Sequence, residues 1–226
     1  MPDSATTDLQ QTTASVESVR TTLELDLVLG RLRPRERLVE DELMTRLNAK
    51  RHVVRSALTD LERSGLVERR PNRGAVVREY SAGEVEEIYA FRADLHRLAV
   101  ERMALPLEPA IVDELISLTQ QHEAAIEHND LAEVILCNNA FHDLLFDQCG
   151  NRFLADSIRQ LAWAANAIRS YRIANPRLLN QAAEEHRRMI DAAVAGDRTT
   201  LSDLVARHIL PSKDIYLRDK SIREAR

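Results

Sequence analysis

The stretch around Asn48 most constrains how this chain can fold. On both sides of Asn48, apolar residues recur three or four positions apart, which lets two short helices bury one shared seam. Asn48 marks the turn between them, because asparagine tolerates the left-handed backbone that most residues avoid. The pattern is typical of a helix-turn-helix. Its seam consists of Leu43, Leu47, Val54, Ala57, Leu58 and Leu61.

The second of these helices, expected over residues 50–64, carries a basic face. Arg51 and Arg55 lie four positions apart and therefore point the same way, with Lys50 and His52 beside them. A helix with apolar residues packed behind it and arginines at its N-terminal end fits the major groove of DNA. Most basic helix faces are simply solvated, so this face alone leaves the function open.

The residues on both sides of the helix-turn-helix are expected to add a helix and two strands to it. Helices are expected over residues 15–29 and 40–47, and Gly30 ends the first of them. Residues 66–70 and 75–78 are expected to form two strands with turn residues between them. Arg73, on that tight loop, is placed to enter a minor groove; an ordinary exposed hairpin arginine is the alternative.

The charge is unevenly distributed along the chain. The 226 residues carry a net charge of -5, yet residues 19–78 carry +5 and residues 79–226 carry -7. A basic module joined to an acidic remainder indicates that only the first part meets nucleic acid. We therefore divide the chain into a disordered tail (1–14), a DNA-binding module (15–78), a linker (79–80), a helical domain (81–219) and a C-terminal tail (220–226).

Composition also excludes some classes of protein. Cys137 and Cys149 are far apart and form no Cys-x-x-Cys, so neither a disulfide framework nor a zinc ribbon is expected. No apolar run reaches membrane-spanning length and no signal peptide opens the chain. We expect a cytoplasmic protein without a membrane partner.

Helical periodicity dominates after Tyr80. Ser81 and Glu84 form a capping box that opens a helix ending near residue 104. We expect this helix to bury one stripe of residues: Val85, Ile88, Phe91, Leu95 and Leu98. Five further helices are expected over about 108–128, 130–149, 152–173, 176–195 and 198–217. Short connections make six such helices an antiparallel bundle.

Polar residues adjoin the apolar stripes of three of these helices. They are Asn138, His142, His186 and His208. Imidazoles that converge from three helices make a metal site, whereas each histidine by itself is more simply a core or surface residue. Periodicity cannot show convergence, so both interpretations stay open. His122 and His128 are interpreted as solvated and are assigned no role.

Residues 30–78 resemble the winged helix of GntR-type bacterial transcription regulators. The family's first motif is matched by Gly30, Leu32, Pro34, Leu38, Glu40 and Leu43, and its recognition-helix motif by Arg51, Val54, Arg55, Ala57 and Leu58. Leu61-Glu62, Gly65-Leu66-Val67 and Pro71-Asn72-Arg73-Gly74 match as well. The chain departs from the family pattern at four positions: Arg35 and Asn48 replace glycines, Lys50 replaces a serine and Val53 a proline.

This resemblance implies a fold and a set of DNA contacts. The fold is mainly α, with an N-terminal winged helix-turn-helix and a C-terminal antiparallel bundle of about six helices. The partner is a double-stranded operator. The contact residues are Lys50, Arg51, His52, Arg55, Arg73 and Gly74. His52 occupies a variable base-facing position, so the operator sequence does not follow from the resemblance.

Residues 81–217 are similar to the effector domain of the FadR-like branch, which is of the FCD type. That branch usually carries Asp-x-x-x-His where this chain has Asn138 and His142, and Glu-His where it has Glu185-His186. The resemblance implies a divalent metal ion held by Asn138, His142, His186 and His208, with a small carboxylate above it. Because all four ligands are neutral here, the site favours Zn or Ni over Mn.

The same resemblance suggests residues that contact the carboxylate effector. Arg92 matches an arginine that often reaches it, and His96 stands where the family usually has a glutamate. Arg169, Tyr171 and Arg172, late in the fourth helix of the bundle, are further candidates. For the arginines, a salt bridge or a surface position is the alternative.

The function expected from these features is ligand-controlled regulation of transcription rather than enzymatic activity. We expect a repressor that binds an inverted-repeat operator as a homodimer. One alternative is a metal-dependent enzyme on the helical bundle, although no carboxylic acid is clearly placed as its general base. The other is a metal sensor, in which the ion itself is the signal.

Overall fold

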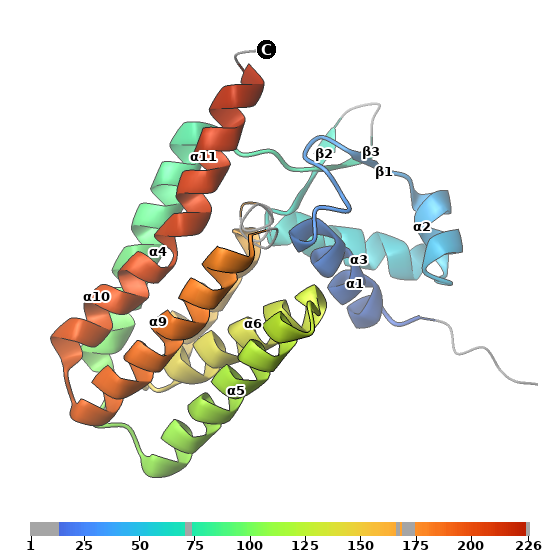
Figure 1. Cartoon of the computed structure of the whole chain (residues 1–226). Coiled ribbons are helices and arrows are strands. Elements are labelled where there is room, and N and C mark those ends of the chain that lie inside the picture. Colours follow the sequence, from blue (N-terminus) through green and yellow to red (C-terminus); the bar gives the residue numbers. More distant parts are fainter. Residues whose placement is uncertain (1–13, 71–73, 166–167, 169–174, 225–226) are drawn as a thin grey trace, which may run out of the picture.

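The computed structural model describes residues 14–70, 74–165, 168 and 175–224 (Figure 1). Its N-terminal unit contains α1 (Val16–Val28), β1 (Arg37–Leu38), α2 (Glu40–Arg46), α3 (Arg51–Arg63), β2 (Val67–Arg70) and β3 (Gly74–Val77). The strands form an antiparallel sheet in the order β1-β3-β2, with Val76 opposite both Arg37 and Glu68. The predicted winged helix-turn-helix is therefore confirmed. The two-residue β1 was not predicted, because it is too short to show alternation.

The turn between α2 and α3 follows the chemistry of Asn48. This residue adopts a left-handed backbone with φ of 47°, a conformation that asparagine tolerates better than most residues. Behind it, Val54, Ala57 and Leu61 of α3 are buried in the same core as Leu43 of α2. The shared apolar seam thus holds α3 in place and leaves its basic face outside.

The C-terminal part of the chain is helical. Its elements are α4 (Ala82–Arg102), α5 (Pro109–Glu127), α6 (Leu131–Asp147), α7 (Arg152–Ala164), α9 (Pro176–Ala195), α10 (Arg198–His208) and α11 (Leu210–Glu224). The predicted capping box of Ser81 and Glu84 begins α4, and the side chains of Asn175 and Asp197 cap α9 and α10. Gly196, left-handed at φ of 70°, ends α9. None of the helices in the described ranges is long and apolar enough to cross a membrane.

Two predicted helices differ from the structure. The fourth helix of the bundle ends at Ala164, and Ala165 lies in a turn. The sixth is two helices, α10 and α11, separated at Ile209. Pro211 explains this break, because proline has no N–H to donate and its ring disfavours a continuous helix. Residue 220 does not begin a tail either, since α11 continues to Glu224 and Lys220 is buried.

The buried stripe predicted for α4 was wrong at two of its five positions, since Val85 is buried and Ile88 and Leu95 pack against the cores. Phe91 is 55 % exposed and Leu98 is 38 % exposed, whereas Arg92 and His96 are buried. The buried face consists of Val85, Tyr89, Arg92, Ala93, His96, Ala99 and Val100. The spacing of apolar residues alone does not reveal this face, because two of its central positions carry polar side chains.

The two units share packing at their junction. Tyr80, in the predicted linker 79–80, is only 2 % exposed and belongs to the core that contains α3. Its hydroxyl donates to the carbonyl of Gly65, just after α3, at 2.6 Å. A second contact joins Val28 of α1 to Ile135 of α6, and Figure 1 shows α1 beside the end of α6. The winged helix is therefore packed against the bundle.

Candidate functional site

The basic edge of α3 is exposed, as predicted. Lys50, Arg51, His52 and Arg55 all lie at the solvent-facing start of the helix. Gly74 begins β3 in a left-handed conformation with φ of 70°. Arg73, predicted to contact a minor groove, lies outside the described residues. The edge presents cations on a helix N-terminus that can enter a major groove.

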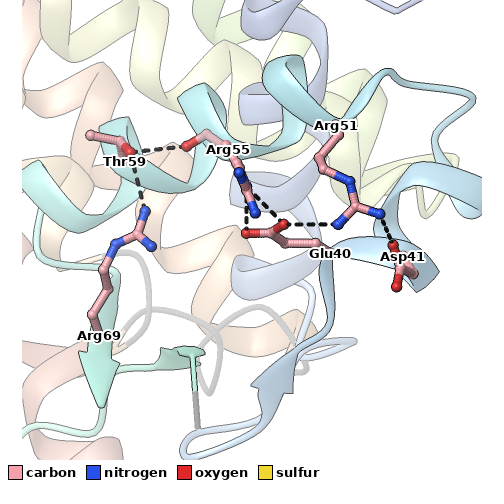
Figure 2. A network of polar contacts seen from close by, with 6 residues as sticks. All are labelled: Glu40, Asp41, Arg51, Arg55, Thr59 and Arg69. Atoms are coloured by element: carbon pink, nitrogen blue, oxygen red, sulfur yellow. Dashed lines mark hydrogen bonds and ion pairs between the residues drawn. The ribbon is translucent and has the colours of Figure 1, made fainter. Parts of the chain in front are cut away.

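The two arginines of this edge are paired with acids of α2 (Figure 2). Both carboxylate oxygens of Glu40 accept from Nε of Arg55, at 2.9 and 3.1 Å. Arg51 donates from one terminal nitrogen to Glu40 at 3.5 Å and from the other to Asp41 at 2.6 Å. These pairs were not predicted from the sequence, because the partners are ten to fifteen positions apart.

Three histidines meet inside the bundle. His142 of α6, His186 of α9 and His208 of α10 offer ring nitrogens that all lie within 4.8 Å of one another. The Nε2 atoms of His142 and His186 are 3.4 Å apart. His186 and His208 are almost fully buried. The convergence that periodicity could not show is therefore present, and nitrogen donors at this spacing suit a transition-metal ion.

A carboxylate orients one of these rings. Glu185 accepts a hydrogen bond from Nδ1 of His208 at 2.6 Å, which directs Nε2 of His208 away from Glu185. Ligating histidines commonly have such a partner on the second ring nitrogen, because it fixes the tautomer and the ring orientation. Asn138 lies one turn before His142 on α6 and is 8 % exposed. Its amide oxygen can ligate a metal ion but adds no charge.

A cavity of about 50 Å³ adjoins the histidines, which is room for a few waters or a small acid. The predicted residues Arg92, His96, Asn138, His142 and His208 line it. Residues of this cavity that the sequence analysis missed include Tyr89, Asn139, Phe146, Arg159 and Ser212. The predicted effector contacts Arg169, Tyr171 and Arg172 lie outside the described residues.

Arg92 is a buried cation in this cavity. It is 5 % exposed, and its Nε has no hydrogen-bond partner. Within the described ranges no carboxylate pairs with it, and its guanidinium lies 5.0 Å from the ring centre of Tyr89. Burial lowers the pKa of Arg92 from its ordinary value. A buried guanidinium without a counter-charge is costly, so the cavity favours an anion.

His96 stays neutral beside this cation. Burial, together with the charge of Arg92, lowers the pKa of His96 to about 3. The backbone carbonyl of Val205 lies 3.1 Å from its Nδ1. His96 therefore adds no positive charge near pH 7, and it gives Arg92 no negative one.

The interpretation of His122 as a solvated residue was wrong. His122 is 1 % exposed, and its ring centre lies 5.2 Å from that of His186. A signal was present, because His122 follows Leu115 by seven positions and Leu118 by four on α5. His128 is exposed at the end of α5, as expected.

Comparison with known proteins identifies both halves of the chain. Residues 15–77 match the model "Bacterial regulatory proteins, gntR family", and residues 87–210 match the FCD domain. The HTH-type transcriptional regulator YdhC of Bacillus subtilis is 28 % identical over 79 % of this chain and 80 % of its own. The HTH-type transcriptional repressor RspR of Escherichia coli is 26 % identical over 72 % of each chain.

Solved structures show the same fold. Escherichia coli McbR/YncC superposes with a TM-score of 0.77 at 24 % identity, covering 92 % of this chain and 99 % of that one. A transcriptional regulator from Rhodococcus sp. RHA1 superposes with a TM-score of 0.73 at 20 % identity, covering 89 % and 97 %. The arrangement of a winged helix on a helical domain is thus shared with these structures.

Proposed function

Because the chain belongs to the GntR family of bacterial regulatory proteins and carries an FCD domain, we propose that it is a repressor whose helical domain binds a divalent metal ion and a small carboxylate. Its identity as a DNA-binding transcription regulator is the premise. The repressor role is supported by the similarity to RspR, which is named a repressor.

The convergence of three imidazoles supports the metal ion. His142, His186 and His208 supply neutral nitrogen donors from three helices, and Asn138 would add a neutral oxygen. Glu185 supports the site from outside through Nδ1 of His208. A donor set of imidazoles and an amide suits Zn or Ni better than Mn. When bound, the ion would supply an uncompensated positive charge.

The observation that carries the proposal is that Arg92 shares one cavity with His142 and His208. Neutral ligands leave the charge of the ion uncompensated, and Arg92 has no carboxylate partner in the described residues. Both charges are buried and therefore need an anion. A small carboxylate supplies it, because guanidinium and carboxylate form paired, charge-assisted hydrogen bonds. Ion and acid should then each tighten the binding of the other.

The winged helix is proposed to read DNA through Arg51 and Arg55, with Lys50 and His52 beside them and a wing contact from residues 73 and 74. One winged helix reads only a few base pairs, so useful specificity needs two copies. We therefore propose a homodimer on an inverted-repeat operator. Acid binding would change the relative pose of the two winged helices and so the operator affinity.

A metal-dependent enzyme and a metal sensor are the two alternatives to an acid-controlled regulator. The families that match the chain are those of transcription regulators, so a metal-dependent enzyme has no support from them. A metal sensor is the second candidate, because the three histidines by themselves could form the regulatory site. Operator binding with and without a chelator, at a fixed acid concentration, separates a sensor from an acid-controlled regulator.

The test of the metal site is calorimetry on the full-length chain. Zinc titrated into metal-free protein should bind at one ion per chain, and His186→Ala should lose this binding while the winged helix stays folded. Small carboxylates should then raise the melting temperature of the zinc-loaded protein more than that of the metal-free protein. A metal-free preparation that cannot be loaded would overturn the site.

A further inference from the structure

We infer that two adjacent acids of α2 have opposite effects on the availability of the α3 arginines to DNA. Glu40 positions Arg55 for reading a base, whereas Asp41 competes with DNA for Arg51. The inference rests on the proposed DNA-reading role of the two arginines. It adds two residues that contact no DNA themselves but determine how selectively the protein binds it.

Glu40 holds Arg55 by its inner nitrogen. Both carboxylate oxygens accept from Nε, and the side chain of Glu40 is only 25 % exposed. Within the described part of the chain, the hydrogen bonds and the ion pair of the Arg55 guanidinium use Nε alone, so its two terminal nitrogens keep their donors. Those donors form the fork that reads O6 and N7 of a guanine. Figure 2 shows the guanidinium of Arg55 against Glu40. Glu40 thus reduces the rotamer freedom that Arg55 would lose on binding.

Asp41 holds Arg51 in a different way. The two terminal nitrogens of Arg51 donate to acids, one to Asp41 at 2.6 Å and the other to Glu40 at 3.5 Å. The edge that would meet a guanine or a phosphate is therefore occupied. The side chain of Asp41 is 72 % exposed and lies against a terminal nitrogen of Arg51 (Figure 2). DNA must displace this carboxylate, and its charge then lies near the phosphate backbone.

The two arrangements have different consequences for selectivity. Non-specific binding to DNA depends almost entirely on contacts between cationic side chains and phosphates. Asp41 weakens those contacts for every sequence, and only a well-placed base contact for Arg51 offsets the displacement. Glu40 improves the base contact of Arg55 without blocking its donors. Both acids thereby raise the ratio of specific to non-specific affinity. Glu40 does so by raising the affinity for the specific sequence, and Asp41 by lowering the affinity for all other sequences.

Three charge-matched variants test this inference in the full-length chain: Glu40→Gln, Asp41→Asn and Glu42→Gln. Each removes one negative charge from the first turn of α2. Glu42 is the control, because it is exposed and pairs with no arginine among the described residues. The probes are a duplex recovered from a random pool by selection with the unchanged protein, and a scrambled duplex of the same composition. Fluorescence anisotropy over a range of salt concentrations gives the affinity for each.

General electrostatics predicts the same small gain in DNA affinity for all three variants. Our inference predicts three different results. Glu40→Gln should lower affinity for the selected duplex by roughly five- to a hundred-fold relative to Glu42→Gln, which is the range of one bidentate base contact. It should bind the scrambled duplex as Glu42→Gln does, which also shows that the variant is folded. Asp41→Asn should bind the scrambled duplex several-fold more tightly than Glu42→Gln.

A positioning role also predicts that the loss caused by Glu40→Gln on the selected duplex depends on Arg55, which Glu40 holds at 2.9 and 3.1 Å, rather than on the longer contact of Glu40 with Arg51 at 3.5 Å. In an Arg55→Ala background, Glu40→Gln should cause no further loss on the selected duplex, and a further loss would contradict this role. The inference fails if Glu40→Gln and Asp41→Asn both have the same affinities as Glu42→Gln for the two duplexes. If Arg55→Ala still weakens binding to the selected duplex in that case, the proposed function stands. If the Arg51→Ala/Arg55→Ala double variant binds as tightly as the unchanged chain, the proposed DNA-reading role itself fails.

Discussion

Tyr216 donates its hydroxyl hydrogen to the backbone carbonyl of Tyr80 at 3.0 Å, in a buried position. Tyr80 in turn donates to the carbonyl of Gly65, which follows α3. Two successive hydrogen bonds therefore run from α11 to the end of the helix that carries Arg51 and Arg55. Ser212, one turn before Tyr216, lines the cavity that contains Arg92. The proposed effector site and the proposed DNA-reading helix are thus joined through α11.

Replacing Tyr216 by Phe should lower the free energy of unfolding by about 1–3 kcal/mol, because it leaves the buried carbonyl of Tyr80 without its donor. Tyr80→Phe should cost less, since Gly65 is only half-buried and water can reach its carbonyl. Urea denaturation followed by circular dichroism measures both changes. Equal stabilities of Tyr216→Phe and the unchanged chain would show that this hydrogen bond contributes nothing.

The carboxylate of Glu185 should matter for metal affinity although it is not a ligand. Glu185→Gln weakens the hydrogen bond that orients His208 and should reduce zinc affinity by roughly ten- to a hundred-fold, the usual effect of losing such a partner. The neighbouring Glu184→Gln is the matched control, because Glu184 pairs with Arg187 and not with a histidine. Competition with a zinc chelator gives both affinities. Similar zinc affinities for the two variants would contradict the orienting role.

Arg92 should destabilise the protein when no acid is bound. Replacing it by Met removes a buried unpaired charge and keeps much of the volume, so the free energy of unfolding of the acid-free protein should rise by roughly 1–4 kcal/mol. The same variant should lose the thermal shift caused by small carboxylates. Arg97→Met is the control on α4, because Arg97 is exposed and pairs with Asp94. A destabilised Arg92→Met variant that still responds to acids would refute the anion site.

Glu24 should make stability depend on pH. Burial raises its pKa from an ordinary value near 4.5 to about 7, although Arg20 partly opposes the shift. Ionisation of Glu24 therefore costs more in the folded chain than in the unfolded one. This cost is absent below pH 4.5, grows between pH 4.5 and 7, and reaches at most about 3 kcal/mol above pH 7.

Glu24→Gln should remove this loss of stability between pH 4.5 and 7, whereas Glu17→Gln should not, since Glu17 on the same helix is exposed. Unfolding free energies measured at several pH values give the comparison. Parallel pH profiles for Glu24→Gln and the unchanged chain would show that Glu24 does not carry the effect.

The sequence predicted the elements whose signals are local. Asn48 marked the turn of the helix-turn-helix, and helix caps such as Ser81 marked the starts of helices in the bundle, because these depend on a few neighbouring residues. The break at Ile209 was missed although Pro211 lay two residues beyond it. The helical periodicity continues across this position and predicts one helix, although a proline inside such a pattern indicates a break.

The site was less predictable because it depends on contacts between distant positions. The histidine positions on α6, α9 and α10 were identified, but only the packing of these helices shows that the rings converge. His122 was missed because a buried histidine breaks the expected apolar pattern, and Arg92 was placed by resemblance rather than by burial. The pairing of Arg55 with Glu40 depends on the angle between α2 and α3, which no periodicity contains.

The most direct test of the account is the operator affinity of the zinc-loaded protein as a small carboxylate is added. The acid used is the one with the largest thermal shift in the carboxylate panel, and the probe is the selected duplex. We predict that the acid changes the dissociation constant by five-fold or more, in line with typical coupling free energies, and that Arg92→Met and His186→Ala abolish the change. An acid that binds the zinc-loaded protein by calorimetry yet leaves the dissociation constant for DNA unchanged would contradict the account.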